Sequence, residues 1–175
     1  MDMLTDGLQK SHYAPATLND AYSEKVYNLY LKRIDNNKRF LLQSDIGQLQ
    51  KFKHAIDDQI KEVNLEFFEV SDAMLSKGIE RGRSFYTKIL AAPFDFSVDE
   101  QYDLDMEDRD WAANSDAQQE LWRKSLKHST LSRLVDKLEE QEKAVEENET
   151  SVTIKTFEEL ELETRNKVKT SYDNY

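Results

Sequence analysis

Glycine and proline are scarce in this chain, since its 175 residues contain four Gly and two Pro. Asn-Gly turns between alternating Val, Ile and Thr runs, which are typical of β-hairpins, are missing as well. The sequence therefore predicts an all-α fold. No stretch repeats at a fixed period of about 20 to 50 residues, which excludes a solenoid. We expect an irregular multi-helix bundle around one long central helix, with one long acidic loop.

Capping residues and breaks in the apolar pattern place the first helices. A short amphipathic piece near the start carries Leu4, Leu8 and His12. Asn19 or Asp20 can cap the next helix, which the stretch 35–37 breaks. Its expected buried residues are Tyr22, Val26, Leu29, Tyr30 and Ile34. Ser44 or Asp45 can cap a third helix, whose expected inward residues are Ile46, Leu49, Phe52 and Ile56.

The longest helical pattern runs from about Leu65 to Ala91 and ends against Pro93. One apolar stripe on it consists of Phe68, Leu75, Ile79, Tyr86 and Leu90. A neighbouring stripe with bulky ends and a small middle consists of Phe67, Ser71, Met74, Gly78, Gly82, Phe85 and Ile89. Each glycine costs about 1 kcal/mol of helix propensity relative to Ala. Gly78 and Gly82 are therefore candidate packing contacts, where we expect another helix to approach closely.

Helical periodicity disappears between Pro93 and Asn114. A loop of this length is usually functional or is fixed by its own side chains. The segment 115–118 has capping-box spacing and opens the next helix, in which we expect a break near His128.

The C-terminal part is rich in glutamate before its last helix. The stretch 139–155 is interpreted as a solvated helix end or as a mobile linker. A second capping box, Thr156 with Glu159, starts a helix that runs to the end of the chain near Tyr175. We expect a single helical domain over 1–175 that is a fragment of a longer protein.

Acidic residues outnumber basic ones by 35 to 24, which gives a formal net charge of −11. Phosphate binding needs clustered Lys and Arg, so nucleic acid is excluded as a partner, and an anionic membrane surface is disfavoured. No apolar run approaches the roughly 20 residues that a transmembrane helix needs. The chain has no Cys, which excludes disulfides and thiolate chemistry but leaves the redox compartment open.

Patterns that mark catalytic and cofactor sites are missing. The chain has no Gly-x-Ser-x-Gly elbow, no Ser-x-x-Lys motif and no glycine-rich phosphate loop. His12, His54 and His128 lie too far apart for a zinc-binding spacing. We therefore expect no catalytic residue, no cofactor and no metal ligand.

One ligand-like cluster is present, in the acidic loop. Its members are Asp95, Asp99, Glu100, Asp103, Asp105, Glu107, Asp108 and Asp110, with Arg109 as the sole base. Hard cations prefer carboxylate oxygens, but an EF-hand loop would also need a Gly at its turn and a Glu at its twelfth position. Neither follows Asp103, so we interpret these acids as solvated residues and helix caps, with a divalent-cation module as an alternative.

Four aromatic residues remain as candidate contacts: Phe94, Phe96, Trp111 and Trp122. They either pin the loop to the helical core or form an exposed patch on which another domain docks. Together with Gly78 and Gly82, they are the candidate interdomain or packing contacts of the chain.

Several segments resemble, in the same order, the N-terminal region of bacterial tail-specific proteases, also called carboxy-terminal processing peptidases. They are Tyr30-Leu31-Lys32-Arg33-Ile34-Asp35, 39–46, Pro93-Phe94-Asp95-Phe96, Trp111 with its acidic lead-in, and Leu121-Trp122-Arg123-Lys124 with Leu126-Lys127. The resemblance covers most of the chain. One departure is Asn36, where relatives often have Pro after the Asp.

The resemblance implies a periplasmic or cell-envelope serine endopeptidase that recognises unstructured or apolar C-termini through a PDZ domain and cuts with a Ser/Lys dyad. In that family both parts lie C-terminal to this region, so neither maps onto a residue of this chain. The implied role is a non-catalytic N-terminal domain that packs on the PDZ and protease domains and helps substrate access, with an accessory protein as a further partner. The alternative is a freestanding helical adaptor.

Overall fold

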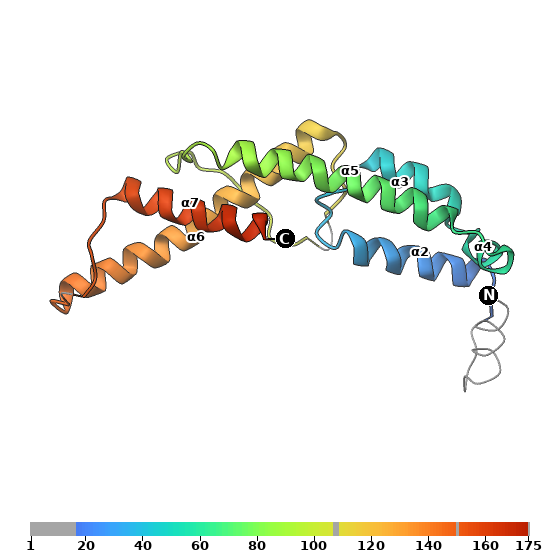
Figure 1. The fold of residues 1–175 in the computed structure, drawn as a ribbon, viewed down its shortest axis with the longest axis horizontal. Coiled ribbons are helices and arrows are strands. Elements are labelled where there is room, and N and C mark those ends of the chain that lie inside the picture. Colours follow the sequence, from blue (N-terminus) through green and yellow to red (C-terminus); the bar gives the residue numbers. More distant parts are fainter. Residues whose placement is uncertain (1–16, 107–108, 150, 175) are drawn as a thin grey trace. The chain divides into compact units, whose positions relative to one another are not determined.

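A computed structural model describes residues 17–106, 109–149 and 151–174. Within these ranges it contains helices and a single isolated β-bridge but no strand (Figure 1). The helices are α2 (Asp20–Ile34), α3 (Gln43–Leu49), the 3₁₀ turn η1 (Gln50–Phe52), α4 (Ile56–Glu62), α5 (Glu66–Ile89), α6 (Ser115–Glu146) and α7 (Phe157–Asp173). The predicted all-α class is confirmed. The piece predicted around Leu4, Leu8 and His12 lies outside the described residues.

The chain is organised as two compact units. The first unit comprises Met1–Ile79 and Met106–Ser115, and the second comprises Glu80–Asp105 and Asp116–Tyr175. Helix α5 gives its N-terminal part to the first unit and its C-terminal part to the second. The single domain expected over 1–175 stays a prediction.

The first unit is built around the buried ring of Phe67, at the start of α5. This side chain has no exposed surface, and its ring centroid lies 5.8 Å from that of Tyr27 and 5.7 Å from that of Phe52. The other buried members of this core are Leu31, Leu41, Leu49 and Ile56. Aromatic rings at such separations add to the stabilisation that burial of their area provides. The core therefore joins α2, α3, α4 and α5.

The buried face of α2 differs from the predicted one. Ser23, Tyr27 and Leu31 are buried, whereas the predicted Leu29 is 50% exposed. Ser23 explains the shift, because its hydroxyl donates to Asp57 Oδ1 at 2.6 Å and accepts the Asp57 N–H at 2.8 Å. A prediction from the spacing of apolar residues does not identify a buried serine of this kind. The remaining predicted residues, which are partly buried, are Tyr22, Val26, Tyr30 and Ile34.

The predicted third helix is divided into α3, η1 and α4. Helix α3 begins at Gln43, so Asp45 lies inside its first turn and is not the residue that precedes the helix. From that position the Asp45 carboxylate accepts the Leu42 N–H at 2.8 Å. Ser44 is exposed. The inward residues Leu49, Phe52 and Ile56 are buried as predicted, and Ile46 is partly buried.

The buried face of helix α5 is the stripe that has bulky residues at its ends and Gly78 and Gly82 in its middle. Along it Phe67, Ser71, Gly78, Gly82 and Phe85 are buried. Of the other stripe, Tyr86 and Leu90 are buried, whereas Phe68 is 40% and Ile79 is 43% exposed. Gly78 permits a close approach, because a Cβ atom there would lie 2.4 Å from the carbonyl oxygen of Phe40. The neighbour is thus the backbone of a loop, not another helix as predicted.

The replacement of Gly78 by Ala tests this contact. The change favours the helix by about 1 kcal/mol. Because a backbone carbonyl fills the space, we expect a net loss of stability, since overpacking typically costs about 1–3 kcal/mol. Gly47→Ala is the matched control, because Gly47 is also helical but has nothing within 4 Å of the added Cβ. Denaturant unfolding should show Gly78→Ala less stable and Gly47→Ala more stable than the wild type; equal stabilisation by both would contradict the contact.

The second unit packs α6 and α7 with the last turns of α5. Its buried apolar residues are Phe85, Tyr86, Leu90, Trp122, Leu126, Leu134, Ala144, Leu160 and Val168. Helix α6 has 32 residues and α5 has 24, so the longest described helix is α6 and not the one predicted. The expected break near His128 is absent, because no Gly or Pro interrupts α6 and the nearby Thr130 is fully buried. Residues 139–146 form the C-terminal end of this helix, where most positions are exposed but Ala144 is buried.

Capping chemistry sets the start of α7 as predicted. The side chain of Thr156 accepts the Glu159 N–H at 3.3 Å, and the Glu159 carboxylate accepts the Thr156 N–H at 2.9 Å. Two donors at the helix start are satisfied in this way. At the start of α2, the Asn19 side chain accepts the Tyr22 N–H at 3.0 Å, which confirms the predicted cap.

Candidate functional site

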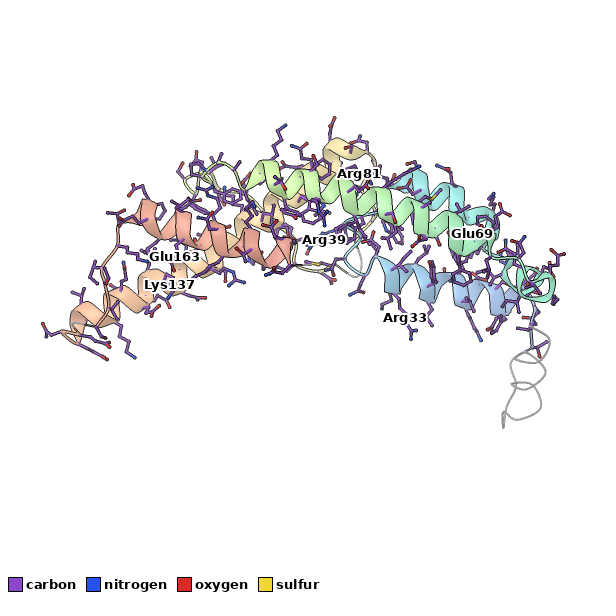
Figure 2. All side chains as sticks on the ribbon, viewed as in Figure 1. Arg33, Arg39, Glu69, Arg81, Lys137 and Glu163 are labelled. Carbon is purple, nitrogen blue, oxygen red and sulfur yellow. The ribbon has the colours of Figure 1, made fainter. Side chains whose placement is uncertain are left out.

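The irregular segment between α5 and α6 carries three of the candidate contact residues, Phe94, Phe96 and Trp111. Figure 2 shows the side chains of the described residues along the helices and the loops between them. The described part of the segment that ends at Asp105 belongs to the second unit, and the part from Arg109 to Ser115 belongs to the first. Each part is fastened by its own cluster of buried or half-buried polar groups.

In the first unit the buried carboxylate of Asp35 organises the turn that follows α2. Asp35 is 2% exposed and ends the helix as its C-cap. Its oxygens accept the backbone N–H groups of Arg39 at 2.9 Å, Phe40 at 3.2 Å and Leu41 at 2.9 Å. A buried charge is costly unless it is compensated by hydrogen bonds of this kind. The carboxylate therefore fixes the backbone of residues 39–41.

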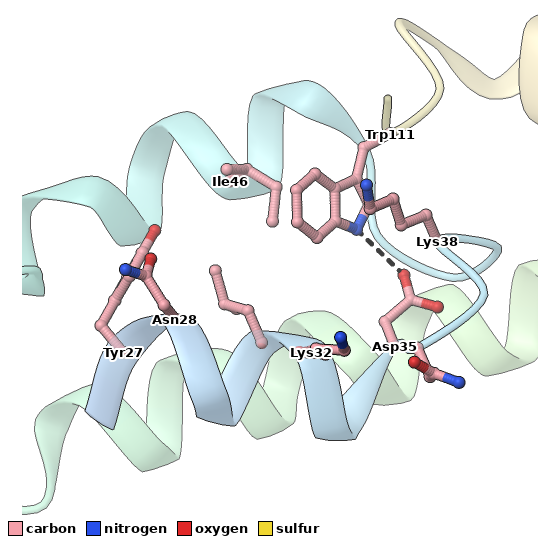
Figure 3. A pocket seen from close by; sticks show the side chains of 9 residues that line it. Tyr27, Asn28, Lys32, Asp35, Lys38, Ile46 and Trp111 are labelled. Atoms are coloured by element: carbon pink, nitrogen blue, oxygen red, sulfur yellow. Dashed lines mark hydrogen bonds between the residues drawn. The ribbon is translucent and has the colours of Figure 1, made fainter. Parts of the chain in front are cut away.

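The same carboxylate also holds Trp111. The indole Nε1–H donates to Asp35 Oδ2 at 3.2 Å (Figure 3). The Lys38 ammonium lies 5.0 Å from the centroid of the indole ring and donates to the Arg109 carbonyl. In addition, the Gln43 N–H donates to the Ala112 carbonyl at 3.0 Å. Residues 109–112 are thus fastened to the loop between α2 and α3.

Asp35→Asn tests the importance of this carboxylate. The amide keeps the shape but loses the charge and turns an NH₂ group towards backbone N–H donors. We expect a loss of about 2–3 kcal/mol in the free energy of unfolding, because hydrogen bonds to a charged group are among the strong ones. The control is Asp72→Asn, at an exposed position of α5. Denaturant unfolding of both variants gives the comparison, and a similar small effect for the two would contradict the role of Asp35.

In the second unit a buried ion pair fastens the end of α5. The Arg165 Nε donates to Glu161 Oε1 at 2.9 Å, and the two side chains are 9% and 5% exposed. Arg165 Nη1 also donates to the Leu90 carbonyl at 2.7 Å, while Glu161 Oε1 accepts the Phe94 N–H at 3.3 Å. The pair on α7 therefore caps α5 and fixes the chain as it leaves that helix.

A second cluster of this unit ties the acidic segment to α6. Glu100 accepts hydrogen bonds from Arg123 and, at 2.6 Å, from Lys127. Lys124 and Lys127 also reach the carbonyls of Gln101 and Val98, at 3.2 and 3.4 Å. Arg123, and then Lys127, hold the pKa of the Glu100 carboxyl at about 2, below its ordinary value of 4.5. Glu100 is therefore a paired acid.

The lowered pKa of Glu100 predicts a pH dependence. Since the folded-state pKa is depressed, the stability contributed by this carboxylate is complete above pH 4.5 and is lost as the pH falls towards about 2. The difference in melting temperature between the wild type and Glu100→Gln should be largest at neutral pH and shrink over that window. Glu140→Gln, which removes an exposed pair with Lys137, should give a small difference throughout. A Glu100→Gln difference that stays constant as the pH falls would contradict the pairing.

Trp122 has different surroundings from Phe94 and Phe96. Trp122 is 3% exposed, and its ring centroid lies 5.5 Å from that of Tyr172. Phe94 and Phe96 are partly exposed, and the Phe96 ring lies 6.4 Å from the ring of Phe157, which is 47% exposed. Trp122 is therefore surrounded by its own unit, whereas Phe94, Phe96 and Phe157 present an aromatic cluster at the surface.

In the part of the acidic loop that the structure describes, the carboxylates are not gathered into a metal site. Among the residues that the structure describes, no group of three His, Asp or Glu side chains is placed to hold a metal ion. Asp95 accepts the Ser97 hydroxyl and backbone N–H, and Asp103 accepts the Asp105 N–H. These acids act as local turn-forming residues. Glu107 and Asp108 lie outside the described residues.

Sequence reasoning did not identify the roles of Asp35, Glu100, Glu161 and Arg165 in fastening the segment, although it named Glu100 as a member of the acidic cluster and Asp35 in a segment that resembles the family. Each of the four contacts a residue distant in the chain. The pair at positions 161 and 165 does have the i, i+4 spacing of a helical ion pair, which was the one local signal available.

These features define an all-α chain in which a long irregular segment is fixed at both ends by buried polar groups. The family described as tail specific protease N-terminal domain matches residues 4–174. The chain belongs to this family.

A curated relative is the tail-specific protease of Haemophilus influenzae, which is 33% identical over 105 residues. The matched stretch covers 59% of this chain and 15% of that protein. The chain thus spans only a small part of the length of this relative.

Proposed function

We propose that this chain is the non-catalytic N-terminal domain of a periplasmic tail-specific serine endopeptidase. The proposal is supported by the family match over residues 4–174. It is also supported by the relative from Haemophilus influenzae, because the matched stretch makes up only 15% of the length of that protein. The remainder of such a protein would hold the PDZ domain and the Ser/Lys dyad that the resemblance implies. Within the described residues, no helix is both long and apolar enough to cross a membrane.

The proposed role is to pack on the PDZ and protease domains and to help substrates with unstructured C-termini reach them. The partly exposed cluster of Phe94, Phe96 and Phe157 is suited to such a contact, because aromatic residues are enriched at protein interfaces. Trp122 is too deeply buried to take part directly. An accessory protein is a further candidate partner for the same surface.

The test uses the natural protein that carries this domain, and measures cleavage of an unstructured protein with an apolar C-terminus. Phe157→Ala should lower the cleavage rate several-fold with little change in melting temperature, because the side chain is half exposed. The control is Val145→Ala, at a 60% exposed position of α6, which should leave the rate unchanged. The 175-residue chain alone should not cleave the substrate.

Cleavage by the 175-residue chain alone would overturn the proposal, since the chain would then hold its own catalytic site. A natural protein without protease activity would also overturn it and would favour a freestanding helical adaptor. An unchanged rate in Phe157→Ala would remove the aromatic cluster from the proposed contact with the other domains.

A further inference from the structure

The C-terminal half of α6 has a second apolar face besides the one that packs inside its own unit. On the inner face, Leu134 and Ala144 are buried. The exposed apolar residues of this half, which are between 37% and 60% exposed, are Leu131, Val135, Leu138 and Val145. They follow one another at intervals of four, three and seven residues, which is the heptad spacing of a helix that packs against another helix. We name these four residues the outer stripe.

The outer stripe leads into a cleft at its N-terminal end. The cleft has a volume of about 350 Å³, and Leu131 lines it together with Phe96, Val98 and Tyr102. All four residues belong to the second unit. Single exposed apolar side chains are common on protein surfaces, but a row of them that ends in a cleft is typical of a site for another protein. A large side chain of the occupant can enter the cleft and serve as an anchor.

Acidic residues border the outer stripe. Between positions 131 and 149 the chain has seven acidic and three basic residues. Glu142 lies on the stripe itself, and Glu139 and Glu146 occupy the heptad positions next to it. All three glutamates are exposed. In the part of the chain that the structure describes, no ion pair involves any of the three. An occupant of the stripe therefore meets a negative border.

This charge pattern selects the kind of occupant. An antiparallel pairing of two copies of the stripe would bring Glu139 and Glu142 close to their own counterparts, and like charges across an interface are costly. A helix with Lys or Arg on its flanks would instead bring opposite charges to the border, which favours both binding and the rate of encounter. A charged group within the stripe also distinguishes it from permanent interfaces, which are more apolar.

We propose that the outer stripe binds an amphipathic helix of another protein, with apolar residues at heptad spacing and Lys or Arg on its flanks. The apolar face of this helix packs on the outer stripe, and one large side chain enters the cleft beside Phe96. The basic flanks face the three glutamates. In this mode of recognition, apolar residues one and two turns apart supply the contact. The proposal is independent of the contact proposed for Phe157, because it concerns a separate partner protein.

The test uses a fluorescently labelled synthetic peptide of Leu and Lys, with Leu at heptad spacing, Lys on the flanks and a length that matches the stripe. Fluorescence anisotropy follows its titration with the whole 175-residue chain, and we expect saturable binding. A peptide with Glu in place of Lys is the control for charge and should bind several-fold more weakly. Sedimentation of the chain without peptide should show a monomer.

Variants test whether the peptide binds on α6. Leu138→Gln should weaken binding several-fold with little change in melting temperature, because this side chain is 37% exposed. Leu29→Gln is the matched control, since it removes an exposed leucine from α2 in the first unit and should leave the affinity unchanged. Glu142→Gln should also weaken binding, whereas Glu69→Gln, at an exposed position of α5, should not.

The proposal is overturned if the Leu/Lys peptide does not bind, if both peptides bind equally, or if Leu138→Gln and Leu29→Gln have the same effect. A dimer of the chain that Leu138→Gln dissociates would also overturn it, because a second copy would then cover the stripe. Loss of peptide binding in the natural protein that carries this domain would overturn it too, because other domains of that protein would then cover the stripe.

Discussion

The buried carboxylate of Asp35 is the interaction on which the first unit depends. A charge that is 2% exposed would oppose folding if its oxygens were not hydrogen bonded. The donors come from residues 39–41 and from the indole of Trp111. Because this turn is fixed, the Phe40 carbonyl can lie against α5 at Gly78, where no side chain would fit. One acid at the end of α2 therefore determines the turn, the contact with α5 and the attachment of residues 109–112.

In the second unit, buried charges are compensated by ion pairs. Arg165 and Glu161 bind the Leu90 carbonyl and the Phe94 N–H, so the helix end and the departing chain share one buried pair. Breaking a buried pair by removing one partner is strongly destabilising, since it leaves the other charge uncompensated. The pair of Glu100 with Arg123 and Lys127 is more exposed and is worth less. The acidic segment is thus held mainly at the point where it leaves α5.

Local signals in the sequence predicted the local features of the fold. The cap at Asn19 and the capping box at Thr156 are confirmed because each involves residues three apart. The scarcity of Gly and Pro correctly predicted an all-α fold. The buried face of α2 was missed because the hydroxyl of Ser23 is satisfied by a residue 34 positions away. Close packing at Gly78 was anticipated, but its neighbour, a loop carbonyl, could not be, since the position of that loop depends on Asp35.

Some residues of the candidate site could be predicted from the sequence, but their contacts could not. The aromatic residues were identified, but their different surroundings follow from tertiary contacts: Trp122 is enclosed, Trp111 is fastened to Asp35, and Phe96 lies in a cluster at the surface. Hydrogen exchange can test whether Asp35 holds the turn and Trp111 together, by comparison of the Leu41 amide with the Trp111 indole N–H, which donate to the same carboxylate oxygen. We expect both groups to be protected and to exchange at similar rates, as one opening unit. A protected Leu41 amide beside a freely exchanging Trp111 indole would contradict it.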